Sequence, residues 1–290
     1  MASLFGLVVV GDGAALPIFG LTDNNSLVVF DSETPGTIDL TTAILGLGAG
    51  QSLVGIDFRP ADGQLYGLST DSRLYAINTT SGFASAIGSA GAFTLSGSSF
   101  GFDFNPTVDR IRVTSDAEQN LRLNPNNGLL AATDTNLAYA GTDVHAGANP
   151  GIVGSAYTNS RTGATTTTLF GIDSVLDTLV VQAPPNAGTL NTVGDLGVDT
   201  TDQVGFDILA VGNQAFASLT DNTDRSSLFR INLATGGATG LGLIGNGLSI
   251  IDIAALPIPE PGTISLFAAA LLGTAAARRR RVSPTPAVTG

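Results

Sequence analysis

The sequence predicts an all-β protein, a five-bladed β-propeller, and three observations lead to that fold class. The composition is poor in helix formers and rich in turn and strand residues, since the 290 residues include 37 Gly and no Lys. A phrase of the form Gly-apolar-Asp-apolar recurs at about the length of a propeller blade. The two ends of the repeat region carry complementary parts of one further repeat.

The first 15 residues precede the repeats and hold one short apolar run, residues 4–10. A signal peptide has basic residues before such a run and a small, neutral cleavage region after it. Here no Lys or Arg precedes the run, and Asp12 follows it. We therefore expect residues 1–15 to be an incomplete signal peptide, explained by a start further upstream or by a mis-assigned Met1.

The clearest repeat occupies residues 52–88 and consists of the pieces SLVGIDFRP, QLYGLS, SRLYAIN and SGFASAIG. Each piece alternates apolar and polar positions and ends in turn residues, so together they predict a meander of short antiparallel strands. Its opening phrase returns at residues 101–104 and 205–208, with a degenerate copy at 154–157. The steps between the copies, 46, 53 and 51 residues, fit one blade plus loop insertions.

The ends of the repeat region complete each other. Residues 18–30 resemble the second and third strands of a blade, while residues 248–255 (LSIIDIAA) resemble a lone first strand. If the C-terminal strand docks beside the N-terminal ones, the ring closes and leaves no long edge strand open. An open β-sandwich or solenoid could use the same meanders, but the complementary halves favour a closed propeller over residues 16–257.

A third segment, residues 258–290, follows the repeats. It runs from Pro259, Glu260 and Pro261 through an uncharged apolar stretch, residues 263–277, to Arg278, Arg279, Arg280 and Arg281. The stretch of 15 residues predicts a hydrophobic helix of about 22 Å, short of the ~30 Å hydrocarbon core of a membrane. The four arginines would stay on the cytoplasmic side and leave everything before Pro259 outside.

This order of motif, apolar stretch and basic stop resembles the PEP-CTERM sorting signal of exported bacterial proteins. The resemblance implies processing by an exosortase-type enzyme, transient membrane anchoring, and a final place at the cell surface or in an exopolysaccharide-rich matrix. A plain tail anchor or a buried helix with a basic end are the alternatives. We favour the sorting signal because other processed anchors also place a removable apolar tail behind a small motif.

The body of the chain also resembles a family. The phrases GIDFRPADGQLYGL, GFDFNPTVDRIRV, QNLRLNPNNG, TTTTLFGIDS and QAPPNAGTL, in this order, are similar to an uncharacterised bacterial family, the domain of unknown function 4394. The resemblance covers residues 16–256, nearly the whole body. It implies a frequent association with PEP-CTERM tails, and it brings no established activity or catalytic residue.

Charge and composition exclude several functions. The part before Pro259 carries 8 Arg against 23 Asp and Glu, a formal charge of −15, which excludes nucleic acid as a main partner. The absence of Cys excludes disulfides, thiolate nucleophiles and cysteine metal sites.

His145 is the only histidine, and a Ser-His-Asp triad would need it beside Ser155 or Asp143. Its Gly-rich loop favours an exposed turn residue instead.

Four aspartates share one position of the repeat, namely Asp57, Asp103, Asp207 and Asp252. On the innermost strands they would lie near the propeller axis, where several carboxylates could bind a hard cation such as Ca²⁺. In the structural alternative each Asp accepts hydrogen bonds from backbone N–H groups and holds blade to blade. We favour the structural role, because an element repeated once per blade belongs to the scaffold.

Three arginines gather in one repeat. Arg110 and Arg112 share a face of the strand DRIRV, and Arg122 lies on the next strand. Such a patch could bind an acidic sugar or a phosphate through planar guanidinium contacts. The favoured alternative is that it neutralises nearby carboxylates, Asp103, Asp109 and Asp116.

Taken together, these features favour an exported, non-enzymatic propeller that binds carbohydrate or cations at the cell surface. The rival is a propeller hydrolase or lyase that uses an axial Ca²⁺ to polarise an ester or a sugar acid. An enzyme would need acid, base and metal together in one polar pocket. A scaffold would show the axial aspartates satisfied by backbone donors.

Overall fold

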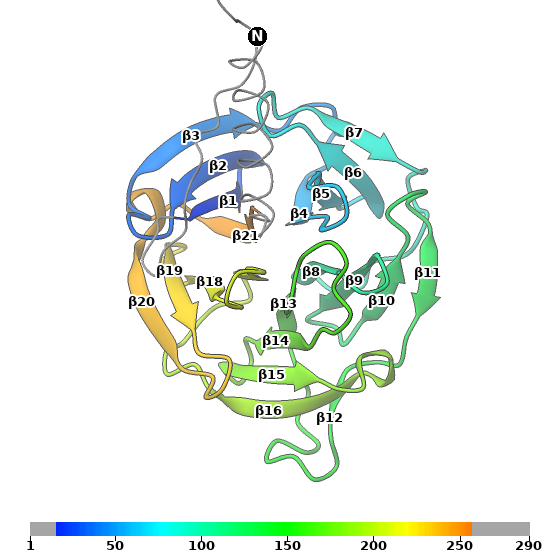
Figure 1. Ribbon diagram of the computed structural model, residues 1–290, viewed down its shortest axis with the longest axis vertical. Helices are drawn as coiled ribbons and strands as arrows, with labels where there is room; N and C mark the ends of the chain where they lie inside the picture. Colours follow the sequence, from blue (N-terminus) through cyan, green and yellow to red (C-terminus); the bar gives the residue numbers. More distant parts are fainter. Residues whose placement is uncertain (1–15, 257–290) are drawn as a thin grey trace, which may run out of the picture. The chain divides into compact units, whose positions relative to one another are not determined.

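The computed structural model describes residues 16–256, which form five β-sheets arranged as blades around a central axis (Figure 1). The expected incomplete signal peptide, the C-terminal hydrophobic helix, the motif Pro259–Pro261 and the stop Arg278–Arg281 lie outside the described residues. Within the described part, no helix has the length and apolar character needed to cross a membrane.

Each blade is an antiparallel meander whose first strand lies nearest the axis. From the axis outward, blade 1 contains β21 (Ile250–Ala255), β1 (Pro17–Thr22), β2 (Ser26–Asp31) and β3 (Ile38–Ala43). In the same order, blade 2 contains β4 (Leu53–Phe58), β5 (Leu65–Ser69), β6 (Arg73–Ile77) and β7 (Ala84–Ile87). Blade 3 contains β8 (Phe100–Asn105), β9 (Arg110–Ser115), β10 (Asn120–Leu123) and β11 (Leu130–Thr133).

Blade 4 has one strand more than the meander that the sequence predicts. It contains β13 (Ile152–Tyr157), β14 (Leu169–Asp173), β15 (Thr178–Gln182), β16 (Thr189–Asp195) and, outermost, β12 (Ala138–Tyr139). The short β12 pairs in parallel with β16, because the long connection from blade 3 passes along the rim before it enters blade 4. Blade 5 contains β17 (Val204–Ile208), β18 (Ala215–Thr220), β19 (Ser226–Ile231) and β20 (Ala238–Leu243). Two single-turn 3₁₀ helices, Pro185–Ala187 and Ile244–Asn246, lie in connections.

The composite blade predicted from the sequence is confirmed. The last strand, β21, pairs antiparallel with the first, β1, and their register places Ala254 opposite Phe19 and Asp252 opposite Leu21. On its other side β1 pairs with β2, so both edges of β1 are used. The ends of the described chain therefore close the ring within one sheet.

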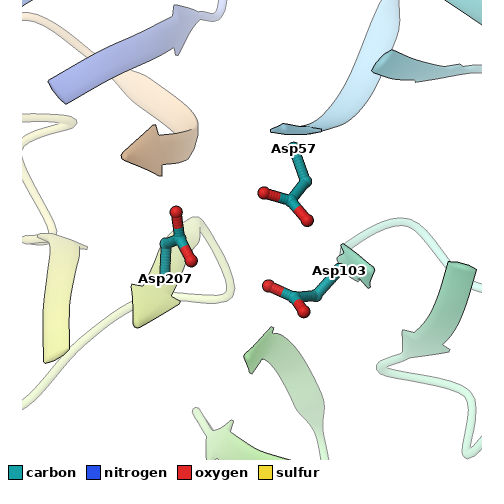
Figure 2. A group of neighbouring side chains, drawn as sticks. All are labelled: Asp57, Asp103 and Asp207. Atoms are coloured by element: carbon teal, nitrogen blue, oxygen red, sulfur yellow. The ribbon is translucent and has the colours of Figure 1, made fainter. Parts of the chain in front are cut away.

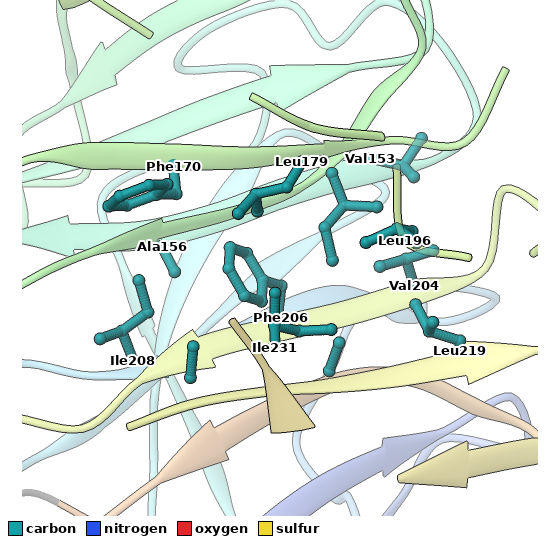
Figure 3. Close-up of a cluster of buried hydrophobic side chains, with 13 residues drawn as sticks. Val153, Ala156, Phe170, Leu179, Leu196, Val204, Phe206, Ile208, Leu219 and Ile231 are labelled. Atoms are coloured by element: carbon teal, nitrogen blue, oxygen red, sulfur yellow. The ribbon is translucent and has the colours of Figure 1, made fainter. Parts of the chain in front are cut away.

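Apolar side chains fill the spaces between neighbouring blades, because each blade buries both faces of its inner strands. Every residue of β5 and of β18 is buried. Figure 3 shows the cluster between blades 4 and 5, where Phe206 of β17 lies among Val153, Phe170 and Leu179 of blade 4. Each such large apolar side chain contributes about 1.5–3 kcal/mol when fully buried.

The glycine of the repeated phrase has a steric cause. A Cβ atom on Gly55 would lie 2.7 Å from the Cβ of Phe102, and one on Gly205 would lie 2.5 Å from the backbone nitrogen of Ile253. In both cases the clash is with the innermost strand of the next blade. Adjacent inner strands therefore approach so closely near the axis that only glycine fits.

We expect the substitution Gly205→Ala to lower the free energy of unfolding by about 1–3 kcal/mol, as overpacking does in a close-packed interior. Gly141→Ala is the matched control, because a Cβ there meets no atom within 4 Å. It should change stability by less than about 0.5 kcal/mol. Denaturant midpoints measure both variants, and equal midpoints for the two would contradict the steric argument.

Candidate functional site at the propeller axis and in an arginine cavity

The inner strands bring the four repeated aspartates to the axis, as the sequence predicts, and we call Asp57, Asp103, Asp207 and Asp252 the axial carboxylates. All four side chains are buried. Oxygen atoms of Asp57, Asp103 and Asp207 lie within 4.8 Å of one another, and Figure 2 shows these three carboxylates facing a common space.

Each axial carboxylate accepts a hydrogen bond from a backbone N–H of the next inner strand. Asp252 accepts from Ile56 at 2.8 Å, and Asp57 accepts from Phe104 at 2.8 Å. Asp103 accepts from Tyr157 at 3.1 Å, and Asp207 accepts from Ala255 at 2.6 Å. Asp57, Asp207 and Asp252 also accept from the N–H of the following residue, at 2.6, 2.6 and 2.9 Å.

The ring of carboxylate contacts is interrupted at one junction. In blade 4 the repeat position of the aspartate holds Ala156, which is fully buried in the apolar cluster shared with blade 5. Blades 4 and 5 are thus joined at the axis by apolar packing, whereas the other four junctions carry a carboxylate.

Burial and mutual repulsion make these carboxylates reluctant to ionise. Burial raises the pKa of Asp207 to about 6. Burial, followed by the negative charges of neighbouring carboxylates, raises the pKa of Asp57 and of Asp103 well above the ordinary value. Burial raises the pKa of Asp252 in the same direction, against the bonds from Ile56 and Ile253. Protonation of the axial carboxylates therefore stabilises the folded ring.

From these pKa shifts we expect the propeller to lose stability as the pH rises from 4 to 7. A carboxyl with a raised pKa holds its proton in the folded state while the unfolded chain has already released it near pH 3.8, so the free energy of unfolding falls across that window. For Asp207 the loss should end just above pH 6, at the order of a few kcal/mol. Urea midpoints at several pH values measure it.

Asp207→Asn separates this effect from repulsion among surface carboxylates, which acts in the same direction. The variant cannot titrate at the axis, so its stability should depend less steeply on pH between 4 and 7 than that of the parent. A parent whose stability increases through this window, or an unchanged slope in the variant, would show that the axial carboxylates do not govern the pH dependence.

The same contacts bear on cation binding. A Ca²⁺ ion takes six to eight oxygen ligands. The converging carboxylates of Asp57, Asp103 and Asp207 could supply some of them, yet both oxygens of Asp57 and of Asp207 and one oxygen of Asp103 already accept backbone N–H bonds. This arrangement fits the structural role better than a metal centre, and the structural role remains our interpretation of these residues.

The three predicted arginines surround a cavity of about 270 Å³ at the junction of blades 3 and 4, which we call the arginine cavity. Arg110 and Arg112 come from β9 and Arg122 from β10. The remaining lining residues are Asn105, Val108, Tyr157, Pro184, Pro185 and Asn186. The structure therefore brings together the three residues that the sequence singled out, beside a loop of blade 4 that sequence reasoning did not connect with them.

The favoured set of partners for these arginines was wrong. Arg112, only 2% exposed, donates to Asp134 at 2.7 Å, to Asn120 at 2.6 Å and to Asn186 at 2.8 Å. Arg122 binds both oxygens of Asp134 at 2.8 Å. Burial acts to raise the pKa of Asp134, but the bonds from Arg122 and Arg112 outweigh it and lower that pKa below the ordinary value.

The three carboxylates expected to neutralise the arginines are engaged elsewhere. Asp103 faces the axis, and Asp116 accepts from the backbone and hydroxyl of Ser98 at 2.9 and 2.6 Å. Asp109 forms an ion pair with Arg59 of blade 2. Asp134 lies beyond the last strand of blade 3, outside the repeated phrases, so no periodicity marked it.

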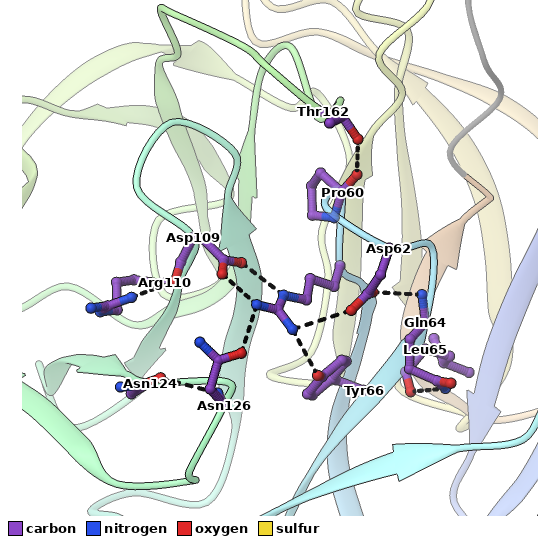
Figure 4. Close-up of polar contacts among 11 residues, drawn as sticks. Pro60, Asp62, Gln64, Leu65, Tyr66, Asp109, Arg110, Asn124, Asn126 and Thr162 are labelled. Carbon is purple, nitrogen blue, oxygen red and sulfur yellow. Dashed lines mark hydrogen bonds and ion pairs between the residues drawn. The ribbon is translucent and has the colours of Figure 1, made fainter.

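Arg59 organises a second polar network between blades 2 and 3, and Figure 4 labels its partners Asp62, Tyr66, Asp109 and Asn126. Besides Asp109 it donates to Asp62 at 3.1 Å, to Tyr66 at 3.2 Å and to Asn126 at 2.8 Å. Nearby, the hydroxyl of Thr162, in the β13–β14 loop of blade 4, donates to the backbone oxygen of Pro60 at 2.5 Å. These contacts fix the loops on the face of the propeller that holds the arginine cavity.

The residues considered for a triad are not brought together as one. His145 lies near Asp143, at 4.0 Å between Nδ1 and Oδ1, and contacts the hydroxyl of Thr192 at 3.1 Å. The hydroxyl of Ser155 is buried and contacts that of Thr114 at 2.8 Å. His145 is thus part of a loop contact on the rim of blade 4, whereas Ser155 lies between inner strands.

Two solved structures resemble this chain. The chain is similar to a structural genomics protein of unknown function from Bacteroides thetaiotaomicron VPI-5482, with 14% identity and a TM-score of 0.52. The match covers 84% of this chain and 66% of that one. A chain of a nidogen/laminin complex matches with 12% identity and a TM-score of 0.48, over 84% of this chain and 98% of its own. No curated protein matches the sequence.

Two family profiles match the sequence. The PEP-CTERM protein-sorting motif matches residues 257–281, which implies export to the cell surface and processing by an exosortase-type enzyme. The other profile, domain of unknown function (DUF4394), matches residues 26–254 and so spans all five blades. The chain therefore belongs to the DUF4394 family, and its β-propeller is followed by a PEP-CTERM sorting signal.

Proposed function

We propose that this chain is a non-catalytic surface propeller, exported, held briefly in the membrane by its apolar tail and then released from that tail by an exosortase-type enzyme. One observation carries the proposal. The closing strand β21 ends at Ala255, and the sorting motif matches from residue 257 onward. Cutting within or behind the motif would therefore remove no strand of the propeller.

The hydrogen bonds that the polar side chains already make support binding rather than catalysis. At the axis, the carboxylates that the rival hydrolase or lyase would use to hold Ca²⁺ accept backbone N–H bonds between blades. The arginine cavity instead offers guanidinium groups beside apolar walls, which suits recognition of a ligand. Association with an exopolysaccharide matrix would follow from such recognition at the cell surface.

Intact-mass measurement of the surface protein tests the proposal. In cells that have an exosortase, the mature protein should lack Arg278–Arg281, and replacing Pro259, Glu260 and Pro261 by Ala should leave the precursor uncut. Replacing Pro284 and Pro286 by Ala is the matched control and should leave processing unchanged. A surface protein that retains the four arginines would make the tail a permanent anchor and overturn the proposal.

A further inference from the structure

We propose that the arginine cavity is a binding site for a sugar unit that carries a carboxylate. The inference rests on the proposed surface location only for the source of the ligand, an acidic polysaccharide. Its chemistry depends on the cavity alone, which lies between β9 and β10 of blade 3 and the β15–β16 loop of blade 4.

The three arginines of the cavity differ in how many of their hydrogen-bond donors are already used. Arg112 is occupied by Asp134, Asn120, Asn186 and the hydroxyl of Tyr157, so it forms the fixed floor of the cavity. Arg110 donates from Nη1 to the backbone oxygen of Asp109 at 2.8 Å, and no other hydrogen bond of its guanidinium is found within the described residues. Its remaining N–H groups are thus available to a ligand.

Arg122 adds a second available donor. It uses Nε and Nη2 on Asp134, and in the described part of the chain its Nη1 has no hydrogen-bond partner. Its side chain is 32% exposed and lines the cavity. A guanidinium that is already oriented by a bidentate carboxylate loses little freedom when a ligand binds.

The arginine cavity also carries a net positive charge. Three guanidinium groups and the one carboxylate of Asp134 give the cavity a formal charge of +2, from 3 minus 1. No carboxylate is found among the described residues that line it. In a body whose formal charge is −15, this is a local site of opposite sign, which favours an anion and disfavours a neutral sugar.

The size and lining of the cavity also fit a sugar unit. A volume of about 270 Å³ is slightly below the range of about 300–1,000 Å³ for small-molecule sites, so it suits one sugar unit. Val108, Pro184 and Pro185 provide carbon surface for the body of the ligand, beyond the part that the arginines contact. A planar carboxylate matches the guanidinium fork, as the pair of Arg122 with Asp134 beside the cavity already shows.

Calorimetric titration of the purified full chain tests this inference with three ligands that differ at a single carbon. Galacturonate should bind, galactose should not bind measurably, and galactose 6-phosphate should bind more weakly than galacturonate. Arg110→Gln should raise the dissociation constant for galacturonate about tenfold or more, because it removes a charged donor that makes only one hydrogen bond within the described protein.

Arg230→Gln is the charge-matched control. Arg230 lies in blade 5, 48% exposed and 3.6 Å from Glu33, far in the sequence from the cavity, and its loss should leave binding unchanged. Equal binding of galactose, tighter binding of the phosphate, or full binding by Arg110→Gln would each overturn the inference. Because the assay uses purified protein, it can fail while tail processing proceeds as proposed, and the reverse also holds.

Discussion

A chain that ends at Gly247 should lose cooperative unfolding and aggregate, whereas a chain that ends at Leu256 should unfold in one transition. The difference between the two is the strand β21, which supplies the whole inner edge of blade 1. Without it, β1 exposes a row of unpaired backbone groups, and an open edge strand is a template for association with other chains.

The loss extends beyond one blade. Asp252 of β21 accepts the N–H bond of Ile56 in blade 2, and the N–H of Ala255 donates to Asp207 in blade 5. Removing the strand therefore breaks the axial bonds from blade 1 to both neighbours and deprives the Asp207 carboxylate of one of its two donors, a costly loss for a charged group. Thermal melting and light scattering measure the outcome. If both chains melt alike, the closed five-bladed ring is wrong.

Arg112→Met should lower the free energy of unfolding by about 3–5 kcal/mol, the range for breaking a buried ion pair by removing one partner. Methionine fills most of the volume but supplies no donor, so Asn120, Asn186 and Asp134 all lose their hydrogen bonds from Arg112 at once. Asp134 keeps its fork with Arg122, which prevents a still larger loss.

Arg110→Gln is the control for this effect, because its side chain makes a bond only to a backbone oxygen in the described residues. It should change stability by less than about 0.5 kcal/mol. Chemical denaturation of the two variants and the parent gives the comparison. Similar losses for both would mean that the arginines act together as one surface patch, without a buried floor.

The fold could be predicted because its signals are local and repeated. The phrase around Asp57 recurs on two further inner strands and in a degenerate form around Ala156. The closing strand could be recognised because its aspartate, Asp252, also lies between apolar residues. Turn residues between alternating strands then fixed the meander. These features depend on residues adjacent in the sequence, which a single chain displays directly.

The arginine cavity could be predicted only in part. The pattern of alternation placed Arg110 and Arg112 on one face, but the partners of Arg112 come from other segments: Asp134 after β11, Asn186 in the β15–β16 loop and Tyr157 on β13. Such contacts join residues far apart in the sequence, and nothing in the spacing of one repeat indicates them. The sequence also did not indicate the correct ion pairs, because Asp109 is the nearest carboxylate in the sequence but pairs with Arg59.

The substitution of Ala156 for the repeated aspartate gives the ring an order of opening. Four interblade junctions carry, besides apolar packing, an axial carboxyl that loses its proton as the pH rises, but the junction of blades 4 and 5 holds an apolar cluster of 13 buried residues and no axial carboxylate. Loosening of the ring at rising pH should therefore begin in blades 1 to 3. Blades 4 and 5 would remain joined as the last ordered part, and their amide hydrogens would exchange most slowly.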